Sequence, residues 1–254
     1  MRTQQKLVAM DNTLLVTLSA QNALRRQMDV AANNMANVST AGYKSEAVLF
    51  EPETVRPAAI RERPGPVNFV RDYTVARDFR PGALQRTGNP LDVALTSDGF
   101  FTVQSPGGPA YTRDGQFKLD AGGRLVTGDG LAVLDDAGQE IRLDLAAGEP
   151  QIGKTGEITQ NGVPVARLGI ATFQRPGALD KIGDNLWRAT IEQPVIAAQP
   201  DMVQGMVEGS NVVAVRELTR IIEINRAYES ISRLQRQAED LRRSSIERLA
   251  RVQS

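Results

Sequence analysis

The segment DNTLLVTLSAQNALRRQMDVAANNMANVSTAG, residues 11–42, carries the first strong periodic pattern of the chain, and no Gly or Pro precedes Gly42. Apolar or small residues recur at spacings of three and four, with Gln21 at one position of the stripe: Leu14, Thr17, Leu24, Met28, Ala31, Met35 and Val38. This spacing predicts a helix with a heptad stripe. The stripe is thin, so the helix would be marginal alone. Ala41-Gly42 is a suitable C-terminal stop.

The other end of the chain repeats this pattern. No Gly or Pro occurs from Ser210 to Ser254, and Ser210 or Asn211 can cap a helix there. The apolar positions again follow a 3–4 spacing: Ile224, Ala227, Ile231, Leu234, Ala238 and Leu241. A helix of ~40 residues would be roughly 60 Å long. No compact core of this size requires so long a helix.

The middle of the chain has a different character. Five prolines interrupt residues 43–86, which predicts an extended connector with short strands around 67–76. From about residue 91 to 190, short β-prone runs alternate with Asp-Gly, Gly-Gly and Asn-Gly pairs. Such pairs supply the positive φ of tight hairpin turns. This region therefore predicts an antiparallel sheet or a small barrel.

The predicted fold class is α+β, with long N- and C-terminal helices pairing as a coiled coil and a central antiparallel β-rich domain. The expected parts are an N-terminal helix (1–42), an extended connector (43–86), a β-rich domain (87–203) and a C-terminal coiled-coil helix (204–254). Pairing would let each thin stripe bury against the other. The alternative is a globular α+β protein whose terminal helices pack on its own sheet.

The composition restricts the possible functions. Hydrophobic residues make up 41% of the 254 residues, which permits a packed core, and 30 basic residues balance 30 acidic ones. The charge balance argues against a nucleic-acid partner. The chain has no Cys and no His, so thiolate chemistry and imidazole acid–base catalysis are excluded. We expect no enzyme activity, no catalytic residue, no metal and no cofactor.

No run reaches the ~18 apolar residues of a membrane span. Asp11 and Asn12 break the early apolar run, so we expect export without a cleaved signal peptide.

Two motifs for ligand binding are rejected. Residues 148–155, GEPQIGKT, match the P-loop string, but Gly156, Gly162 and Pro164 follow where a helix should open. An EF-hand loop counted from Asp129 places apolar residues at two ligand positions. A carboxylate-based hydrolase remains a rival, using two of these residues: Asp114, Asp120, Asp129, Asp135 and Asp136. The Gly after Asp114 and Asp129 favours a role in turns there.

Three blocks of sequence resemble the flagellar axial proteins, the family that includes rod and hook subunits. The first is MDVAANNMANVSTAGYK (28–44), in which Met35 replaces the Leu of the family's NNLAN core. The second begins TGNPLDVA (87–94) and continues through DGFF (98–101) and YTRDG (111–115) to residues 120–130. The third is QGMVEGSNV (204–212), leading to Glu223 and RAYE (226–229). The three blocks occur in the family's order across most of the chain.

The resemblance implies a structural subunit of the bacterial flagellar basal-body rod. Its length and residues 78–95 look closest to the proximal-rod subunits, with the distal-rod subunits as the runner-up. It further implies helical stacking with other rod proteins, passage through the flagellar type III export apparatus, and contact with the surrounding basal-body rings. The expected location is the part of the rod that crosses the periplasm.

The expected assembly interface consists of apolar and Asn side chains of the two terminal segments: Leu24, Met28, Asn33, Asn34, Met35, Asn37, Ile224, Ala227, Ile231, Leu234 and Leu241. The three Asn side chains could bridge neighbouring helices, or simply keep the segment soluble. A rival from another class is a non-flagellar β-domain binding module, for instance for carbohydrate, with helical oligomerisation arms.

Overall fold

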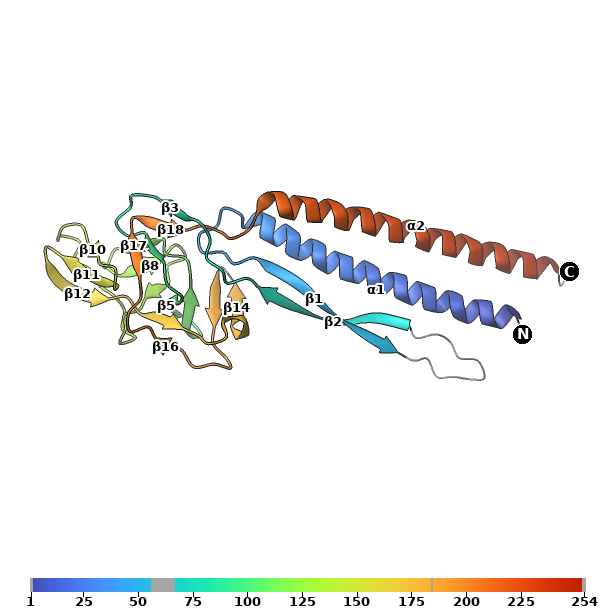
Figure 1. The fold of residues 1–254 in the computed structure, drawn as a ribbon, viewed down its shortest axis with the longest axis horizontal. Helices are drawn as coiled ribbons and strands as arrows, with labels where there is room; N and C mark the ends of the chain where they lie inside the picture. The colour runs from blue at the N-terminus through green and yellow to red at the C-terminus, as the bar shows by residue number, and fades with distance from the viewer. Residues whose placement is uncertain (1, 56–66, 184, 253–254) are drawn as a thin grey trace. The chain divides into compact units, whose positions relative to one another are not determined.

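The computed structural model describes residues 2–55, 67–183 and 185–252 (Figure 1). The chain divides into two compact units. The helical unit comprises Met1–Met35, Glu46–Ala76 and Ala214–Ser254, and the β body comprises Ala36–Ser45 and Arg77–Val213. The division is discontinuous, because the chain enters the β body twice.

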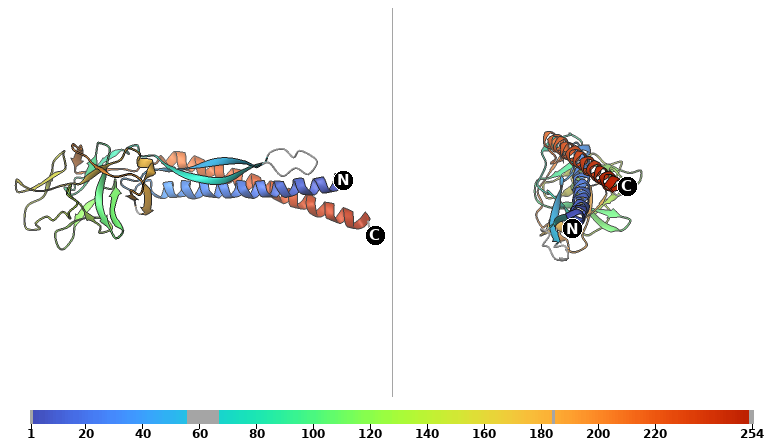
Figure 2. Two further views of the ribbon diagram at one scale, coloured as in Figure 1. Left: turned by 90° about the horizontal axis from the view of Figure 1, so that it is seen from below. Right: turned by 90° about the vertical axis from the view of Figure 1, so that its right-hand side faces the viewer.

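The helical unit contains two helices and a two-stranded ribbon. Helix α1 spans Arg2–Ala36 and helix α2 spans Ala214–Val252, while β1 (Glu46–Val55) and β2 (Val67–Arg77) form the ribbon. Within this unit the helices run antiparallel and side by side, with the ribbon alongside α1 (Figures 1 and 2). Neither helix is interrupted by Gly or Pro, which agrees with their lengths. No helix in the described part of the chain combines the length and apolar character needed to cross a bilayer.

The predicted pairing of the terminal helices as a coiled coil is wrong. Of the expected seam on α2, Ile224 is buried, but Leu234 and Leu241 are 58% and 63% exposed. A polar hydrogen bond from Gln21 Nε2 to Ser232 Oγ, 3.3 Å long, links the two helices at mid-length. The reason lies in the period: a 3.5-residue repeat drifts by about 20° per heptad around a straight helix. Between Ile224 and Leu241 the stripe therefore turns by roughly 50° and reaches solvent.

The ribbon is fixed to α1 by a side-chain amide. Asn34 is fully buried, and its Nδ2 donates to Glu46 O at 2.8 Å while its Oδ1 accepts from Glu46 N–H at 2.9 Å. This pair of bonds imitates a rung of a β-ladder and satisfies both backbone groups at the start of β1. Ala31 and Val48 are buried in the same unit. Among the α1 residues whose burial is described, the buried ones, Ala31 and Asn34, lie in the half that precedes the β body in sequence.

The β body consists of short antiparallel strands. A nine-stranded sheet has the order β14-β15-β6-β5-β9-β8-β7, with β13 paired to both β5 and β16; β10-β11-β12 form a second sheet, and β17-β4 and β18-β3 are separate pairs. The bounds are β3 Leu84–Arg86, β4 Val93–Leu95, β5 Phe100–Ser105, β6 Gly108–Thr112, β7 Phe117–Leu119, β8 Leu125–Thr127, β9 Ala132–Val133, β10 Gln151–Ile152, β11 Glu157–Gln160, β12 Val163–Arg167, β13 Ile170–Thr172, β14 Asp180–Gly183, β15 Leu186–Arg188, β16 Val195–Ile196, β17 Met202–Gln204 and β18 Met206–Glu208. A short 3₁₀ helix, Pro176–Ala178, precedes β14. The antiparallel β-rich region predicted from the turn residues is present.

Two hydrophobic clusters form the core of the β body. The larger one contains Phe101, Leu125 and Ile158, all fully buried. The smaller one is aromatic, and Phe79 packs edge-on against Trp187 with ring centroids 5.2 Å apart. Edge-to-face contacts of this kind stabilise beyond the area they bury. Trp187, the single Trp of the sequence, belongs to this core.

Local turn chemistry agrees with the sequence. Asn161 and Gly162 join β11 to β12 with φ angles of 52° and 78°, as a tight hairpin requires. The P-loop-like string runs through β10 and ends in the turn that precedes β11, so no helix follows Lys154. The four-part division of the chain remains a prediction; residues 43–86 contain β1, β2 and β3.

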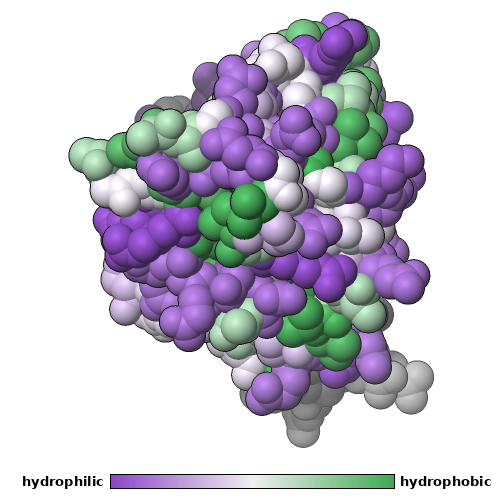
Figure 3. Space-filling model, turned by 90° about the vertical axis from the view of Figure 1, so that its left-hand side faces the viewer, coloured by the Kyte–Doolittle hydropathy of each residue, from purple (hydrophilic) through white to green (hydrophobic). Residues whose placement is uncertain are grey.

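The surface of the β body is mixed. Figure 3 views the end at which β10, β11 and β12 lie in Figure 1, and its hydrophobic side chains form separate groups among hydrophilic ones. Exposed aliphatic residues of this body include Leu145, Val163 and Val165. Scattered groups of this kind are ordinary on a protein surface.

Because the side chains of the α2 stripe are unevenly buried, replacing them with Ala should have unequal effects on stability. We expect Ile224→Ala to reduce the free energy of unfolding of the helical unit by about 2–4 kcal/mol, because it removes a buried side chain. Leu241→Ala should change it by no more than about 0.5 kcal/mol. Urea denaturation followed by far-ultraviolet circular dichroism measures both. Equal losses for the two variants would show that Leu241 is packed as tightly as Ile224.

Candidate functional site

Four segments of the β body converge at one place, which we call the junction: residues 41–45, 78–82, 113–114 and 208–211. The first segment follows α1 in the sequence and the last precedes α2. Both terminal helices are therefore covalently connected to the β body through the junction. Its geometry decides how firmly the two chain ends are held.

Gly42 brings the first segment into close contact with the body. Its φ is +66°, and its N–H donates to Glu208 O at 2.7 Å. A Cβ at this position would lie 2.4 Å from the carbonyl carbon of Arg113 and 2.5 Å from the amide nitrogen of Asp114. Only glycine meets both requirements, a left-handed backbone and a close approach of two backbones.

The residues on either side of Gly42 are held by side chains of the body. Asn185 Nδ2 donates to Ala41 O at 2.6 Å. Tyr43 is almost completely buried, and Lys181 Nζ lies 5.0 Å from the centre of its ring, within the range of a cation–π contact. The Gly-aromatic-Lys step is thus a docking segment rather than a free linker.

A buried ion network forms the centre of the junction. Lys44 Nζ lies 2.5 Å from Glu208 Oε1, and Arg113 Nη1 lies 3.2 Å from Glu208 Oε2. The side chains of Lys44 and Glu208 are 0% and 1% exposed, and that of Arg113 is 6% exposed. Three charges removed from water are tolerated only when they are paired and hydrogen-bonded.

Backbone groups complete the coordination of these charges. Lys44 Nζ also donates to Arg80 O at 2.9 Å, and Arg113 Nη2 donates to Ser97 O at 3.0 Å. Gly82 N–H donates to Glu208 Oε1 at 3.0 Å. Because carbonyl oxygens face the two cations, they compensate for the excess of positive over negative charge in the network.

Burial opposes the charged forms of both cations. It lowers the pKa of the Lys44 ammonium below its ordinary value, and the neighbouring Glu208 carboxylate works in the opposite direction. The pKa of the Arg113 guanidinium is likewise lowered by burial, and Glu208 again opposes the shift. Glu208 is therefore the counter-ion on which both cations depend.

Asn211 joins two segments that do not pair as strands. Its Nδ2 donates to Asp78 O at 2.7 Å and to Arg80 O at 3.0 Å, while its Oδ1 accepts from Ser45 N–H at 2.8 Å. One amide thus replaces the ladder bonds that a regular sheet would supply. The arrangement parallels that of Asn34 in the helical unit.

Asp114 is a junction residue with a raised carboxyl pKa. Burial raises the pKa of Asp114 to about 6; the N–H of Gln116, which donates to its Oδ1, opposes this, and the charges of Asp129 and Asp92 add to it. Its backbone amide is the group that Gly42 approaches.

Asp120 and Asp135, two carboxylates of the rival hydrolase hypothesis, cap turns. Asp120 accepts from the N–H groups of Gly122 and Arg124, and Asp135 accepts from those of Ala137 and Gln139. Such bonds to the backbone two and four residues on are typical of Asx turns. Within the described ranges, no group of three or more His, Cys, Asp or Glu could hold a metal ion.

The residues predicted for the assembly interface lie in varied environments. Ile224 is buried, and Leu24, Met28, Met35, Ala227 and Ile231 are half-buried. Asn33, Leu234 and Leu241 are exposed. Asn34 is used within the chain, and Asn37 Oδ1 accepts from Thr40 Oγ1 at 3.1 Å. The structure does not gather these residues into one site, and their role in assembly stays a prediction.

Sequence reasoning missed the junction residues Glu208, Arg113 and Asn211. Each lies inside one of the blocks on which the family resemblance rests. A usable signal was the single carboxylate of Val207-Glu208-Gly209, charged yet flanked by residues that favour burial or close approach.

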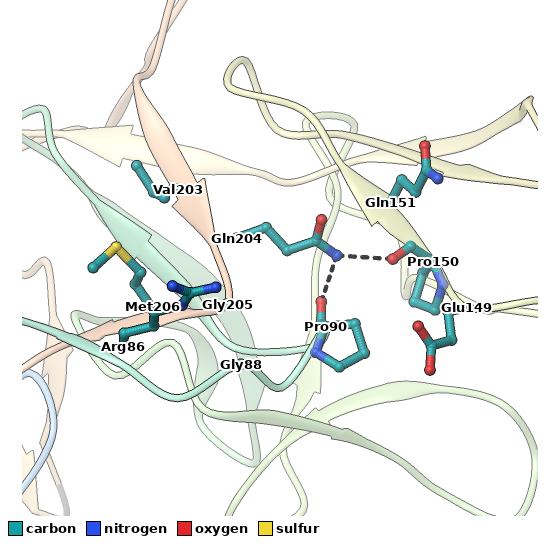
Figure 4. A pocket seen from close by; sticks show the side chains of 10 residues that line it. All are labelled: Arg86, Gly88, Pro90, Glu149, Pro150, Gln151, Val203, Gln204, Gly205 and Met206. Carbon is teal, nitrogen blue, oxygen red and sulfur yellow. Dashed lines mark hydrogen bonds between the residues drawn. The ribbon is translucent and has the colours of Figure 1, made fainter.

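The β body also contains a cleft of about 620 Å³ (Figure 4). Gln204 is one of its lining residues, with Nε2 donating to Pro90 O at 2.7 Å and to Pro150 O at 2.8 Å. The Gln204 Oε1 accepts from Ile152 N–H at 3.2 Å. The amide therefore links β17 to the segment at Pro90 and to residues 150–152. Arg86 and Met206 border the cleft opposite Glu149 and Pro150.

Three protein-family models match the chain. They are described as "Flagella basal body rod protein" (residues 14–44), "Flagellar hook protein FlgE/F/G D1 domain" (94–160) and "Flagellar basal body rod FlgEFG protein C-terminal" (203–248). Each contributes one member of the buried ion network, Lys44, Arg113 and Glu208 respectively. A β body that gathers these three segments, with a helix at each chain end, defines a flagellar axial protein.

Known relatives identify the family more closely. The flagellar basal-body rod protein FlgF of Caulobacter vibrioides is 44% identical over 246 residues, covering 96% of this chain and 100% of that protein. FlgF of Rhizobium meliloti is 37% identical, covering 94% and 98%. FlgG of Bacillus subtilis is 33% identical, covering 85% and 91%. The chain belongs to the flagellar basal-body rod protein family, as its motif blocks suggested. It is a structural subunit of the rod, located in the flagellar basal body.

The close contact at Gly42 predicts a large effect of a single methyl group. We expect Gly42→Ala to reduce the free energy of unfolding of the β body by at least about 3 kcal/mol, from backbone strain and the clash with residue 113. Gly88 also has a positive φ, +76°, but no atom lies within 4 Å of its potential Cβ. Gly88→Ala should therefore cost only about 1 kcal/mol. Chemical denaturation followed by Trp187 fluorescence separates the two, and equal costs would show that the contact at Gly42 is unimportant.

The raised pKa of Asp114 predicts a pH dependence of stability. Because the folded-state pKa, about 6, exceeds the ordinary value of 3.8, the folded state binds the proton more tightly. This stabilisation is complete below about pH 4 and is lost as the pH rises through 6. We compare the unfolding free energy of Asp114→Asn with that of the wild type at each pH. We expect this difference, variant minus wild type, to be about 1–2 kcal/mol larger at pH 7.5 than at pH 4. Denaturation across this pH range measures the difference. A difference that is independent of pH would contradict the raised pKa.

Proposed function

We propose that this subunit transmits torque through the junction. The chain connects α1 and α2 directly to the β body through residues 41–45 and 208–211, and load on either helix would pass along these segments. There the load meets buried ion pairs, a close backbone contact at Gly42 and the amide of Asn211. The single observation that carries the proposal is the Lys44–Glu208 pair, which joins the two chain ends inside the β body.

The proposed position is the proximal rod. Its support is the similarity to proteins named FlgF, at 44%, 37% and 35% identity, compared with 33% for a protein named FlgG. The distal rod is the alternative position. Assembly with other rod components follows from the family.

Further partners are proposed on physical grounds. We propose that the chain passes unfolded through the flagellar export apparatus, for which a chain without Cys is suited, since no disulfide can trap it. Contact with the surrounding basal-body rings follows from the proposed position. We propose no catalysis, because Asp120 and Asp135, two of the carboxylates nominated for it, cap turns.

The test compares two identical chemical changes in cells that lack the native gene. Glu208→Gln removes the shared counter-ion of two buried cations, and breaking such a network costs about 3–5 kcal/mol. Glu140→Gln changes a partly exposed partner of Arg124 and Arg142, worth about 1 kcal/mol or less. We expect Glu140→Gln to restore swimming and Glu208→Gln to fail.

The readouts are swimming, rotation speed of tethered cells and the length of isolated basal bodies. Cells without the gene should yield basal bodies that end within the rod. Swimming cells with complete basal bodies in the absence of the gene would refute the proposed function. Normal rotation with Glu208→Gln would refute only the role of the junction.

A further inference from the structure

Strand β3 pairs on one edge and leaves the other edge open. It lies antiparallel to β18, with Gln85 opposite Val207. Just beyond the two ends of β3, Gly209 N–H donates to Ala83 O and Thr87 N–H donates to Gly205 O, both at 2.9 Å. These backbone groups of residues 83 and 87 therefore face the segment that contains β18. Since bonding alternates along an antiparallel strand, Gln85 also faces β18. The N–H and C=O groups of Leu84 and Arg86 therefore point away from it.

These outward groups have no backbone partner within the described part of the chain. All three residues of β3 are exposed, and Leu84 is 42% exposed although its side chain is aliphatic. Unpaired strand edges can pair with further strands, and proteins usually prevent this with proline, bulges, charged side chains or a covering segment. The edge of β3 carries no proline and no bulge.

Strand β12 shows how this protein closes an edge. It pairs only with β11 in its sheet, and Pro164 within it has no N–H to donate. The register also shifts between Ile158 and Thr159 on the partner strand. Farther along, Arg167 O accepts from Asp136 N–H at 3.2 Å. The edge of β3 has none of these features.

Charge indicates what kind of strand would fit. Arg86 ends β3 at the border of the 620 Å³ cleft, where Pro90 and Met206 supply apolar surface (Figure 4). Arg86 is exposed, so an incoming carboxylate would gain a cationic partner. A second copy of β3 would instead bring another Arg86 to a diagonal position about 7–8 Å away, which is unfavourable.

We propose that the open edge of β3 accepts an extended, acidic segment of a neighbouring rod subunit as an added strand. Backbone groups of Leu84 and Arg86 bind the segment, and the Arg86 guanidinium pairs with one of its carboxylates. Strand addition of this type takes its affinity from main-chain hydrogen bonds. The inference rests on the proposed function of the chain in the rod.

Cross-linking in intact basal bodies tests the contact. The chain has no Cys, so Leu84→Cys creates one attachment point for a maleimide–benzophenone reagent. Val163→Cys on β12 is the matched control, because Val163 is 63% exposed on the edge closed by proline. We expect an adduct between residue 84 and an acidic segment of another rod subunit, and little adduct from residue 163. No adduct at residue 84, equal adducts at both sites, or an adduct to a second copy of β3 would overturn the proposal.

Proline substitutions test the backbone groups directly. Leu84→Pro removes only an outward N–H, so the melting temperature of the purified chain should change by no more than about 2 °C. Its incorporation into basal bodies should fall about tenfold, as expected for the loss of one well-made contact. Gln85→Pro removes an inward N–H and should lower the melting temperature itself. Normal incorporation of Leu84→Pro would overturn the proposal.

The composition of purified basal bodies distinguishes a failure of the proposed rod function from a failure of the proposed contact at β3. If the wild-type chain is absent from purified basal bodies, the proposed function fails. If the wild-type chain is present and Arg86→Glu is incorporated as well as the wild type, only the acidic partner at β3 is refuted.

Discussion

The fold depends on the burial of the Glu208 carboxylate between two cations. Lys44 and Arg113 are too deeply buried to be hydrated, so each needs this carboxylate and the backbone carbonyls around it. The three residues lie far apart in the sequence. None of them is satisfied until the others have arrived, which makes the assembly of the junction cooperative. The β body therefore reaches its native packing at the junction only when the segments of all three residues have come together.

Irregular backbone becomes rigid here because side-chain amides and close contacts replace ladder bonds. Asn211 bridges residues 45, 78 and 80, and Asn34 fixes the start of β1 in the helical unit. Gly42 permits an approach that any Cβ would prevent. A loop held in this way has few alternative conformations, although it contributes no regular strand. Segments 41–45 and 208–211 can thus be as stiff as the sheet that they join.

Local features were predictable from the sequence, and distant ones were not. Asn161-Gly162 predicts a hairpin because its turn depends only on its own φ angles. The heptad stripe predicted a coiled coil, but Leu234 and Leu241 are exposed, because helices that do not supercoil cannot keep a 3.5-residue stripe in contact. The ion network has no local pattern at all: 164 residues separate Lys44 from Glu208. The motif blocks contained both residues without indicating that they meet.

Strength within the subunit and adhesion between subunits rest on different interactions. Buried ion pairs are strong but must be complete inside one chain, since an unpaired partner would be costly. The edge of β3 is only three residues long, and such a short strand gains little from a single pairing in water. A weak contact of this kind does not join free subunits before assembly. It becomes effective once other contacts in the rod raise the local concentration of its partner. The open edge therefore suits the proposed assembly of this chain with other rod subunits.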